Sequence, residues 1–270
     1  MRLGGLFVYP IKGCAGVALD RGRLGPYGLD HDRHWMVVDE ADRVGLTQRT
    51  VPALARVRPR LEAQGSVVLT ADGADPLPVA RPARADTRAT VWGWETPVGD
   101  GGPEAAAWLS SFIGRPCRLV AVSEGYHRPV NPQRDRRGRQ VGFADGYPLL
   151  LCTESSLAEL NRLAGEPVPM DRFRPNLVVT GATAPWVEDG WTHVQVGPAA
   201  FDVAKRCGRC TVPQVDQRTG IRHREPARVL AAHRRDADGQ SYFGINLIHV
   251  DVGGELEVGA EVRAAAPTTS

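Results

Sequence analysis

Short apolar runs, each broken within a few residues by glycine, proline or aspartate, constrain the fold of this chain more than any other feature. The first third contains such runs at residues 6–9, 34–38 and 67–70, and each one ends at a proline or at an Asp-containing turn. The run 34–38 combines aromatic and β-branched residues, which favour extended strands. With 30 glycines and 21 prolines in 270 residues, the pattern predicts a barrel or sandwich rather than a βαβ sheet.

Three segments carry helix signals. Residues 103–113 begin with a proline at the favoured first position and end before Gly114. Residues 156–164 open with a capping-box pair, Ser156 and Glu159, and stop at Gly165. Residues 226–233 again begin with proline. These segments predict three helices.

The second half returns to strand patterns. Strands are expected at residues 176–180, 192–196, 200–204, 243–250 and 256–262, and residues 252–259 are typical of a hairpin. The glycine-rich segment 99–103, or the arginine-rich loop after it, is the expected internal boundary. The residues alone therefore predict a mainly β architecture with a few packing helices.

Composition excludes several classes of protein. A net charge of only +2 gives no reason to expect a nucleic-acid partner. No apolar run approaches the roughly 20 residues that span a bilayer, and the apolar segment at the N-terminus is too short for a signal peptide. Five cysteines, an odd and sparse set, do not form a disulfide framework, so we expect a cytoplasmic protein with no membrane contact.

The basic residues are nevertheless clustered. Residues 128–139 contain five arginines: Arg128, Arg134, Arg136, Arg137 and Arg139. A solvated loop is the simpler interpretation of such a run. A mobile rim over an anionic ligand is the functional one.

The segment 205–211, with the sequence KRCGRCT, holds two of the five cysteines and three cations. Neighbouring cations favour thiolate formation, and a thiolate is a soft metal ligand. A structural zinc site would need a second pair of ligands at finger-like spacing, which the chain does not offer. A thioredoxin-like pair would need a helix directly afterwards, and Thr211 is instead followed by a valine and a proline. Structural thiols, or one thiolate anchor for a metal that brings its own donors, remain open.

A cofactor of that last kind would also need cations for its negative groups. Near strand ends and turns, the candidates are Lys12, Arg33, Arg174 and Arg209. Taken individually, each of these residues is better explained as an ordinary surface charge. Their assignment depends on the motifs around them.

Those motifs resemble a known family. Residues 9–14 (YPIKGC), 28–39 (GLDHDRHWMVVD) and 46–49 (LTQR) resemble three motifs of the N-terminal β-barrel domain found ahead of the MOSC domain, the molybdenum cofactor sulfurase C-terminal domain. Residues 145–150 (DGYPLL), 172–176 (RFRPN), 207–210 (CGRC, with Val215 and Asp216 downstream) and 243–246 (FGIN) are similar to the MOSC domain itself. Seven motifs in order cover nearly the whole chain. The architecture is similar to that of the mitochondrial amidoxime-reducing components and their bacterial counterparts.

The resemblance implies an α+β, predominantly β fold. It places an N-terminal β-barrel domain at residues 1–100, helix 103–113 as a connection, and a β-barrel MOSC domain at residues 120–266. It also implies a pterin-based molybdenum cofactor and reduction of N-hydroxylated compounds. Cys210 would be the metal ligand and Asp145 a second candidate catalytic residue. The cofactor-binding residues would be Lys12, Gly13, Arg33, Asp145, Gly146, Tyr147, Arg174, Asn176, Gly208, Arg209 and Cys210.

The chain departs from the family pattern at a few points. Gly13 stands where eukaryotic relatives carry a hydroxyl, and Pro213-Gln214 replaces a common pair of threonines. No cysteine follows Cys210, so we expect no iron–sulfur cluster in this chain. Electrons would then come from a separate donor protein of the ferredoxin or flavin type.

Two other classes of function stay open at this stage. Cys210 could carry a persulfide in a sulfur-carrier or cofactor-transfer protein, or the chain could be a non-catalytic module that binds an anionic ligand. Metal content and turnover of an N-hydroxylated compound would separate these classes from a reductase.

Overall fold

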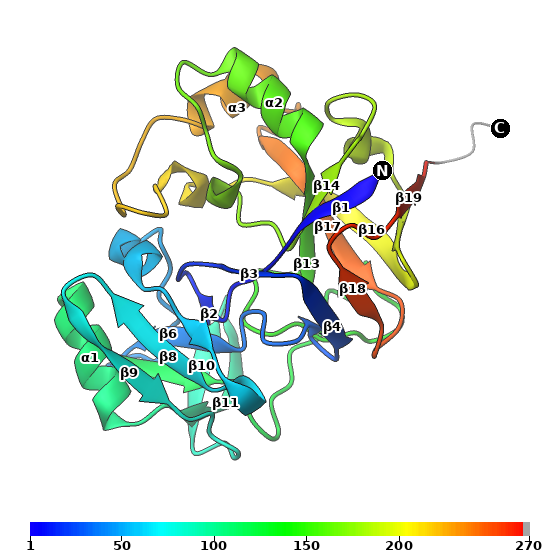
Figure 1. Cartoon of the computed structure of the whole chain (residues 1–270). Helices are drawn as coiled ribbons and strands as arrows, with labels where there is room; N and C mark the ends of the chain where they lie inside the picture. Colours follow the sequence, from blue (N-terminus) through cyan, green and yellow to red (C-terminus); the bar gives the residue numbers. More distant parts are fainter. Residues whose placement is uncertain (267–270) are drawn as a thin grey trace.

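The computed structural model describes residues 1–266, and most of their regular structure is strand. The largest sheet has eight strands in the order β19-β15-β16-β17-β13-β14-β1-β3. Their bounds are β1 Arg2–Val8, β3 Val17–Leu19, β13 Leu149–Thr153, β14 Leu177–Thr180, β15 His193–Val196, β16 Ala199–Gly208, β17 Tyr242–His249 and β19 Val262–Ala265. In Figure 1 this sheet lies in the upper part of the molecule, together with α2 (Glu154–Leu163) and α3 (Ala227–His233).

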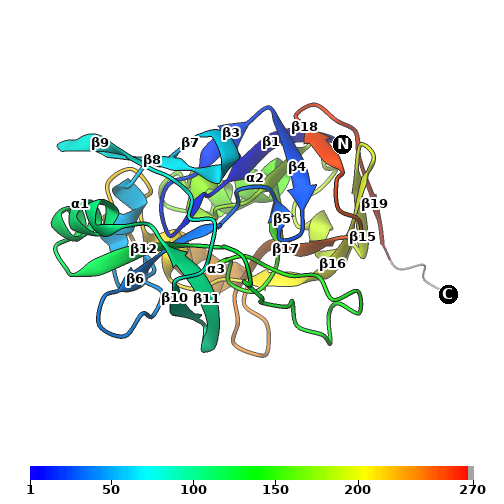
Figure 2. The same ribbon diagram turned by 90° about the horizontal axis from the view of Figure 1, so that it is seen from below.

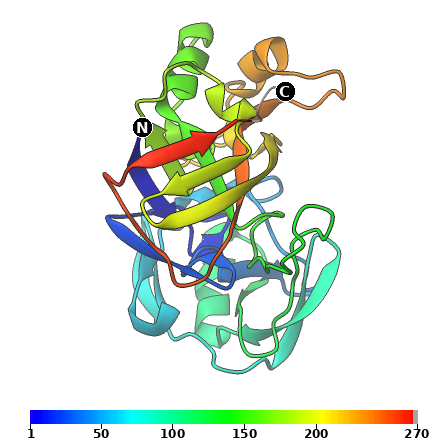
Figure 3. The ribbon, with the colours of Figure 1, turned by 90° about the vertical axis from the view of Figure 1, so that its right-hand side faces the viewer.

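The large sheet curls until β19, at one end, approaches β1, the last strand but one at the other end. The amide of Leu3 donates to Ala260 O at 2.9 Å, and the amide of Val262 donates to Met1 O at 2.9 Å. Figure 3 shows β19 beside the start of β1. The curled sheet encloses a core of leucine, valine and aromatic side chains drawn from almost all of its strands. Within residues 1–266, the ladder approaches a barrel without forming an unbroken ring.

The second part of the molecule is built on a five-stranded sheet with the order β10-β11-β12-β6-β2. Its strands are β2 Ile11–Lys12, β6 Trp35–Asp39, β10 Thr87–Val91, β11 Trp94–Asp100 and β12 Cys117–Ala121. A three-stranded sheet lies next to it, formed by β7 Arg60–Leu61, β8 Val67–Ala71 and β9 Ala74–Val79. Helix α1 (Pro103–Ile113) contacts β9 and β12, as Figure 2 shows. The predominance of strands in the described part of the chain, together with its three α-helices, confirms the predicted α+β, predominantly β class.

The chain crosses between the two parts more than once. Strands β1 and β3 come from the first 20 residues but pair in the large sheet, β1 lying antiparallel to β14. Strand β4 (Arg21–Gly25) pairs with β18 (Glu255–Glu257) and with β5 (Gly28–Leu29). Strand β2, which lies between β1 and β3 in the sequence, pairs instead with β6 of the five-stranded sheet. The division at residues 1–100 and 120–266 stays a prediction, and backbone pairing runs across it.

The three predicted helices are present; α2 starts two residues early and ends one residue early, and α3 starts one residue late. Helix α1 has the predicted bounds and ends at Gly114, whose φ of 74° is left-handed. Helix α2 begins at Glu154, because the Thr153 side chain accepts from the Ser156 amide at 3.2 Å. The hydroxyl of Ser156 instead donates to buried Glu188 at 2.7 Å, so the predicted capping box was wrong.

Two expectations about strands were also wrong. Residues 252–259 do not form a hairpin, because β18 pairs with β4 and β19 pairs with β15. The single strand expected at residues 256–262 is also not formed, because β18 ends at Glu257 and β19 begins at Val262. The expectation of a mainly β architecture rather than a βαβ sheet is confirmed, although β13 and β14 are parallel and α2, which joins them, contacts both. Five short 3₁₀ helices complete the described structure: Pro52–Arg56, Ala63–Gly65, Met170–Arg172, Val187–Gly190 and Val212–Gln214. Among residues 1–266, no helix is both long and apolar enough to cross a membrane.

Candidate functional site

A cavity of about 620 Å³ opens where the two parts of the molecule meet. This volume lies within the roughly 300–1,000 Å³ usual for small-molecule sites. All eleven predicted site residues line it: Lys12, Gly13, Arg33, Asp145, Gly146, Tyr147, Arg174, Asn176, Gly208, Arg209 and Cys210. They come from the end of β2, the loop before β6, the loops before β13 and β14, and the end of β16. Tertiary structure therefore brings together residues that are nearly 200 positions apart in the sequence.

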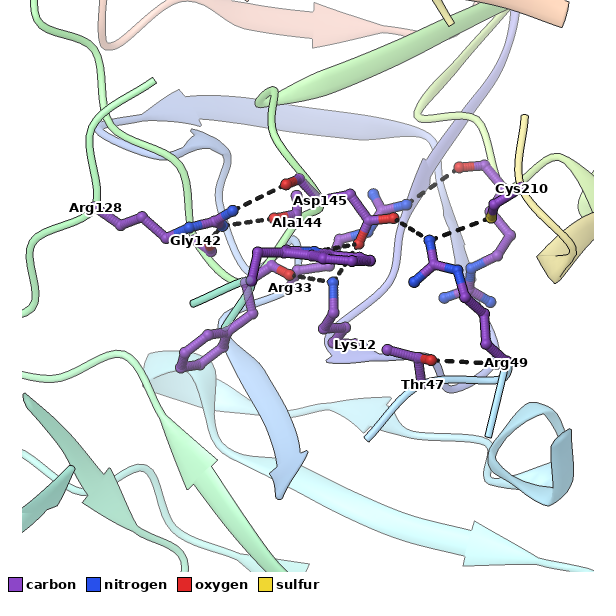
Figure 4. Close-up of polar contacts among 12 residues, drawn as sticks. Lys12, Arg33, Thr47, Arg49, Arg128, Gly142, Ala144, Asp145 and Cys210 are labelled. Carbon is purple, nitrogen blue, oxygen red and sulfur yellow. Dashed lines mark hydrogen bonds and ion pairs between the residues drawn. The ribbon is translucent and has the colours of Figure 1, made fainter. Parts of the chain in front are cut away.

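Lys12 and Asp145 form an ion pair across the two parts of the molecule, shown in Figure 4. The Lys12 ammonium is buried and also donates to Phe143 O at 2.8 Å. Burial of Asp145 opposes its ionisation, but the cations Lys12 and Arg49 outweigh that effect and hold the pKa of the carboxyl well below its usual range. Its side chain is still 58% exposed. Asp145 is therefore an ionised hydrogen-bond acceptor that faces the cavity.

Two arginines stack on one aromatic ring. The guanidinium carbons of Arg33 and Arg174 each lie 4.2 Å from the centroid of the buried Tyr9 ring. Both arginines have positive φ, 50° and 58°, a conformation that is uncommon outside glycine and frequent at functional sites. Arg33 Nη1 also bonds the carboxylate of Asp32 and, at 3.1 Å, Asn176 Oδ1. Burial lowers the pKa of Arg174 to about 10, which keeps it charged at neutral pH.

The paired cysteines lie at the end of β16, and their environments differ. Strand β16 extends to Gly208, four residues beyond the predicted strand, so that Cys207 is in the strand and Cys210 lies just beyond it. Arg209 Nη1 donates to the half-buried Cys207 Sγ at 3.1 Å. A Cβ at Gly208 would meet the Gln240 side chain at 2.8 Å, so a larger residue there would require Gln240 to move. Cys210 is exposed to the cavity, as a ligand must be.

Arg49 is a cavity residue whose role sequence reasoning missed. Its Nη2 lies 3.2 Å from Asp145 Oδ2 and 3.2 Å from Cys210 Sγ, and Figure 4 shows it between the two. Burial works against its charge, but Cys210 and Asp145 together raise its pKa. Arg49 is the last residue of the third family motif (residues 46–49), and this was the feature of the sequence from which its role could have been predicted.

The arginine-rich segment corrects the simpler expectation of a solvated loop. Arg128 is buried, and its guanidinium donates to Gly142 O, Ala144 O and Asp145 O at 2.8, 2.6 and 2.9 Å. Arg139 donates to His249 O at 3.1 Å. Arg128 thus fixes the loop that carries Asp145, while other members of the cluster, such as Arg136, are exposed.

The donor set fits an anionic organic cofactor that brings most of its own metal ligands. Six cationic side chains line the cavity, Lys12, Arg33, Arg49, Arg174, Lys205 and Arg209, against the carboxylates of Asp145 and Asp238. The Nε of Arg209 is buried without a hydrogen-bond partner among the described residues. Within residues 1–266, no group of three His, Cys, Asp or Glu side chains could enclose a metal ion. The cavity is therefore lined by one exposed thiol and several guanidinium groups, and these side chains do not form a zinc site.

Comparison with known proteins agrees with this geometry. The family described as "MOSC N-terminal beta barrel domain" matches residues 1–116, and "MOSC domain" matches residues 138–263. Mitochondrial amidoxime-reducing component 1 of Mus musculus is 32% identical over 252 residues, covering 88% of this chain and 73% of that protein. The human component 1 is 31% identical over 252 residues, covering 88% and 74%.

A second group of relatives is much longer. The molybdenum cofactor sulfurase of Danio rerio is 33% identical over 270 residues, covering 92% of this chain but 32% of the sulfurase. The chain thus spans about a third of the length of the sulfurase that it matches. Both groups of relatives point to a function connected with the molybdenum cofactor. The chain belongs to the family of MOSC-domain proteins that includes the mitochondrial amidoxime-reducing components.

Proposed function

We propose that this protein binds a molybdenum–pterin cofactor and reduces N-hydroxylated compounds, using electrons from a separate donor protein of the ferredoxin or flavin type. One observation carries the proposal: the exposed Cys210 thiol lies within the cation-lined cavity, 3.2 Å from the Arg49 guanidinium. The relatives named amidoxime-reducing components support the reaction class. The five free cysteines support a reducing compartment, and we place the protein in the cytoplasm.

Different cavity residues would bind different parts of the cofactor. Cys210 would supply the protein's thiolate to the metal. Lys12, Arg33, Arg174 and Arg209 would face the anionic groups, because guanidinium groups pair well with phosphate. The remaining predicted contacts would come from Asn176, Asp145 and the main chain at Gly13, Gly146, Tyr147 and Gly208. When bound, the cofactor would supply the two-electron redox chemistry.

In the overall reaction, an external donor would supply the two electrons. An N–OH compound, two electrons and two protons give the corresponding N–H compound and water, and the N–O bond is the one that breaks. Because the Asp145 pKa is depressed, this carboxylate would accept a hydrogen bond from the substrate rather than donate a proton at neutral pH. Its part is therefore to orient the substrate beside Cys210.

The decisive experiment combines metal analysis with an activity assay. Protein made in a host that synthesises the cofactor should contain molybdenum and should reduce benzamidoxime with an artificial electron donor. Cys210→Ser should lose both properties, because a hard hydroxyl replaces a soft thiolate. Cys207→Ser is the matched control and should keep its molybdenum. Full activity and molybdenum in the Cys210→Ser protein would contradict the proposal.

The similarity to sulfurases favours one alternative, a sulfur carrier with a persulfide on Cys210. An exposed thiol beside a guanidinium suits that chemistry as well. The two functions differ in what the protein retains. Stoichiometric labile sulfur that is lost in Cys210→Ser, without molybdenum and without benzamidoxime turnover, would favour the carrier.

A further inference from the structure

The tip of the β10–β11 hairpin has an unusual residue at a strained position. Val91 pairs with Trp94, so the loop consists of Trp92 and Gly93, whose φ values are 53° and 77°. Positive φ at both positions is typical of a type I′ turn, whose first position usually holds Asn, Asp or Gly. A left-handed conformation costs a residue such as tryptophan about 1–2 kcal/mol. Strain of this kind often marks a functional position.

Burial does not compensate for that strain. The Trp92 side chain is 56% exposed, so most of its apolar surface faces solvent. Its contacts are polar and come from the cavity: the indole Nε1 donates to Asp145 Oδ1 at 3.2 Å, and the Arg49 guanidinium lies 4.6 Å from the ring centroid. Lys12 Nζ lies 5.7 Å from the ring. The hairpin therefore places an exposed aromatic surface at the rim of the cavity.

The contacts form a continuous path from this ring to the thiol. Trp92 bonds Asp145, Asp145 pairs with Arg49, and Arg49 reaches Cys210 Sγ at 3.2 Å. A planar molecule that stacks on the open indole surface would have an ionised carboxylate next to it, able to accept hydrogen bonds from N–H groups. An aryl ring carrying an amidine-like head has this combination of features.

We propose that Trp92 selects substrates, favouring N-hydroxylated compounds whose polar head is attached to a planar aryl group. The aryl ring stacks on the indole, and the head donates to Asp145 on the path to Cys210. This inference rests on the proposed function for the identity of the polar head. It concerns recognition, and it can be measured without turnover.

The test compares two ligands on cofactor-loaded protein without an electron donor. Benzamidoxime has the aryl ring, and acetamidoxime has the same head without it. Trp92→Asn removes the ring and installs a residue that suits the turn, which protects folding. Trp92→Phe keeps a flat ring but loses the N–H donor. Trp94→Phe is the matched control, because Trp94 is the other exposed indole of this hairpin and donates instead to His127 O at 2.9 Å.

Calorimetry should show benzamidoxime binding weakened about 2- to 13-fold in Trp92→Asn, since aromatic stacking contributes roughly 0.5–1.5 kcal/mol. Acetamidoxime binding should stay unchanged in that variant. Trp92→Phe should keep most of the preference for benzamidoxime, and Trp94→Phe should match the wild type.

Several results would overturn the inference: no benzamidoxime binding, equal losses for both ligands, or the same loss in Trp94→Phe. A fall in molybdenum content in Trp92→Asn with an unchanged ligand ratio would assign the ring to cofactor retention instead, and would also overturn it. Turnover is measured separately. Trp92-dependent binding without reduction would contradict the proposed reaction but support the inference. Reduction with unaltered selectivity in Trp92→Asn would support the proposed reaction but contradict the inference.

Discussion

At the scale of single residues, the charge of Asp145 organises the site. This exposed carboxylate neutralises the buried Lys12 ammonium and accepts from both Arg49 and Trp92. Sequence reasoning selected Asp145 and Lys12 from motifs. It did not reveal that they contact each other or that Arg49 joins them, because those contacts link loops far apart in the chain.

Replacing Asp145 by asparagine should destabilise the protein by about 1–2 kcal/mol at pH 7, because Lys12 stays buried without its counter-charge while Asp145 itself is partly exposed. A carboxyl with a depressed folded pKa stabilises the fold fully above its unfolded value of about 3.9, and that contribution is lost as the pH falls through the lower folded pKa. Denaturant unfolding of both proteins at pH 7 and at pH 3 should show the difference shrinking at the lower pH. A difference that grows on acidification would contradict this account.

Arg49→Lys tests the bridge to Cys210. A lysine keeps the charge but cannot donate in the same geometry to both Asp145 and the thiol. We expect kcat/KM for benzamidoxime to fall about 10- to 100-fold, in line with roughly 1.5–3 kcal/mol for charge-assisted hydrogen bonds. The unfolding midpoint should stay near that of the wild type. An unchanged kcat/KM would show that Arg49 has no part in the reaction.

At the scale of elements, the loop at residues 142–145 depends on one buried guanidinium. Arg128 donates hydrogen bonds to three carbonyl groups of this loop. These bonds hold the loop, and with it Asp145, in position at the cavity. A run of arginines in sequence looks like a solvated loop, and only the folded chain distinguishes the buried member from the exposed ones.

Arg128→Leu should destabilise the protein by about 2–4 kcal/mol, because buried carbonyl groups lose their donors. Hydrogen exchange at residues 142–146 should accelerate more than exchange in the core strand β17. Arg136→Ala, at an exposed position of the same segment, is the control and should change neither quantity. Equal protection of residues 142–146 in wild type and Arg128→Leu would refute the role given to Arg128.

Element boundaries show what local sequence encodes. Helix α1 has the predicted bounds, because proline and glycine act locally at its two ends. Helix α2 starts two residues early, because buried Glu188 takes the Ser156 hydroxyl and leaves Thr153 as the cap. A group that is distant in the sequence can compete for a hydrogen bond at a helix end, and the local sequence pattern does not reveal this competition.

At the scale of the whole molecule, the two parts share their strands. The first 20 residues supply β1 and β3 to the large sheet, whereas β2, which lies between them, pairs with β6 of the five-stranded sheet. The cavity lies between these parts, so its geometry depends on their mutual position. A sheet that lacks β1 and β3 would expose the edge of β14.

We therefore expect the full chain to unfold in one cooperative transition, and a fragment of residues 120–266 to lack a fixed fold. Matching denaturation curves from far- and near-ultraviolet circular dichroism would check the first expectation. Backbone NMR dispersion of the fragment would check the second. Two separated transitions would contradict the first expectation, and a well-dispersed fragment spectrum would contradict the second.

The sequence by itself determined the mainly β class, the bounds of α1, the family and eleven of the residues that line the cavity, because strand breaks, caps and motifs are local patterns. Only the tertiary structure decided that Arg49 bridges Asp145 and Cys210, that Arg128 is buried, and that Trp92 faces the rim. These are contacts between segments distant in the chain, and their existence depends on how two sheets pack rather than on any neighbouring residue.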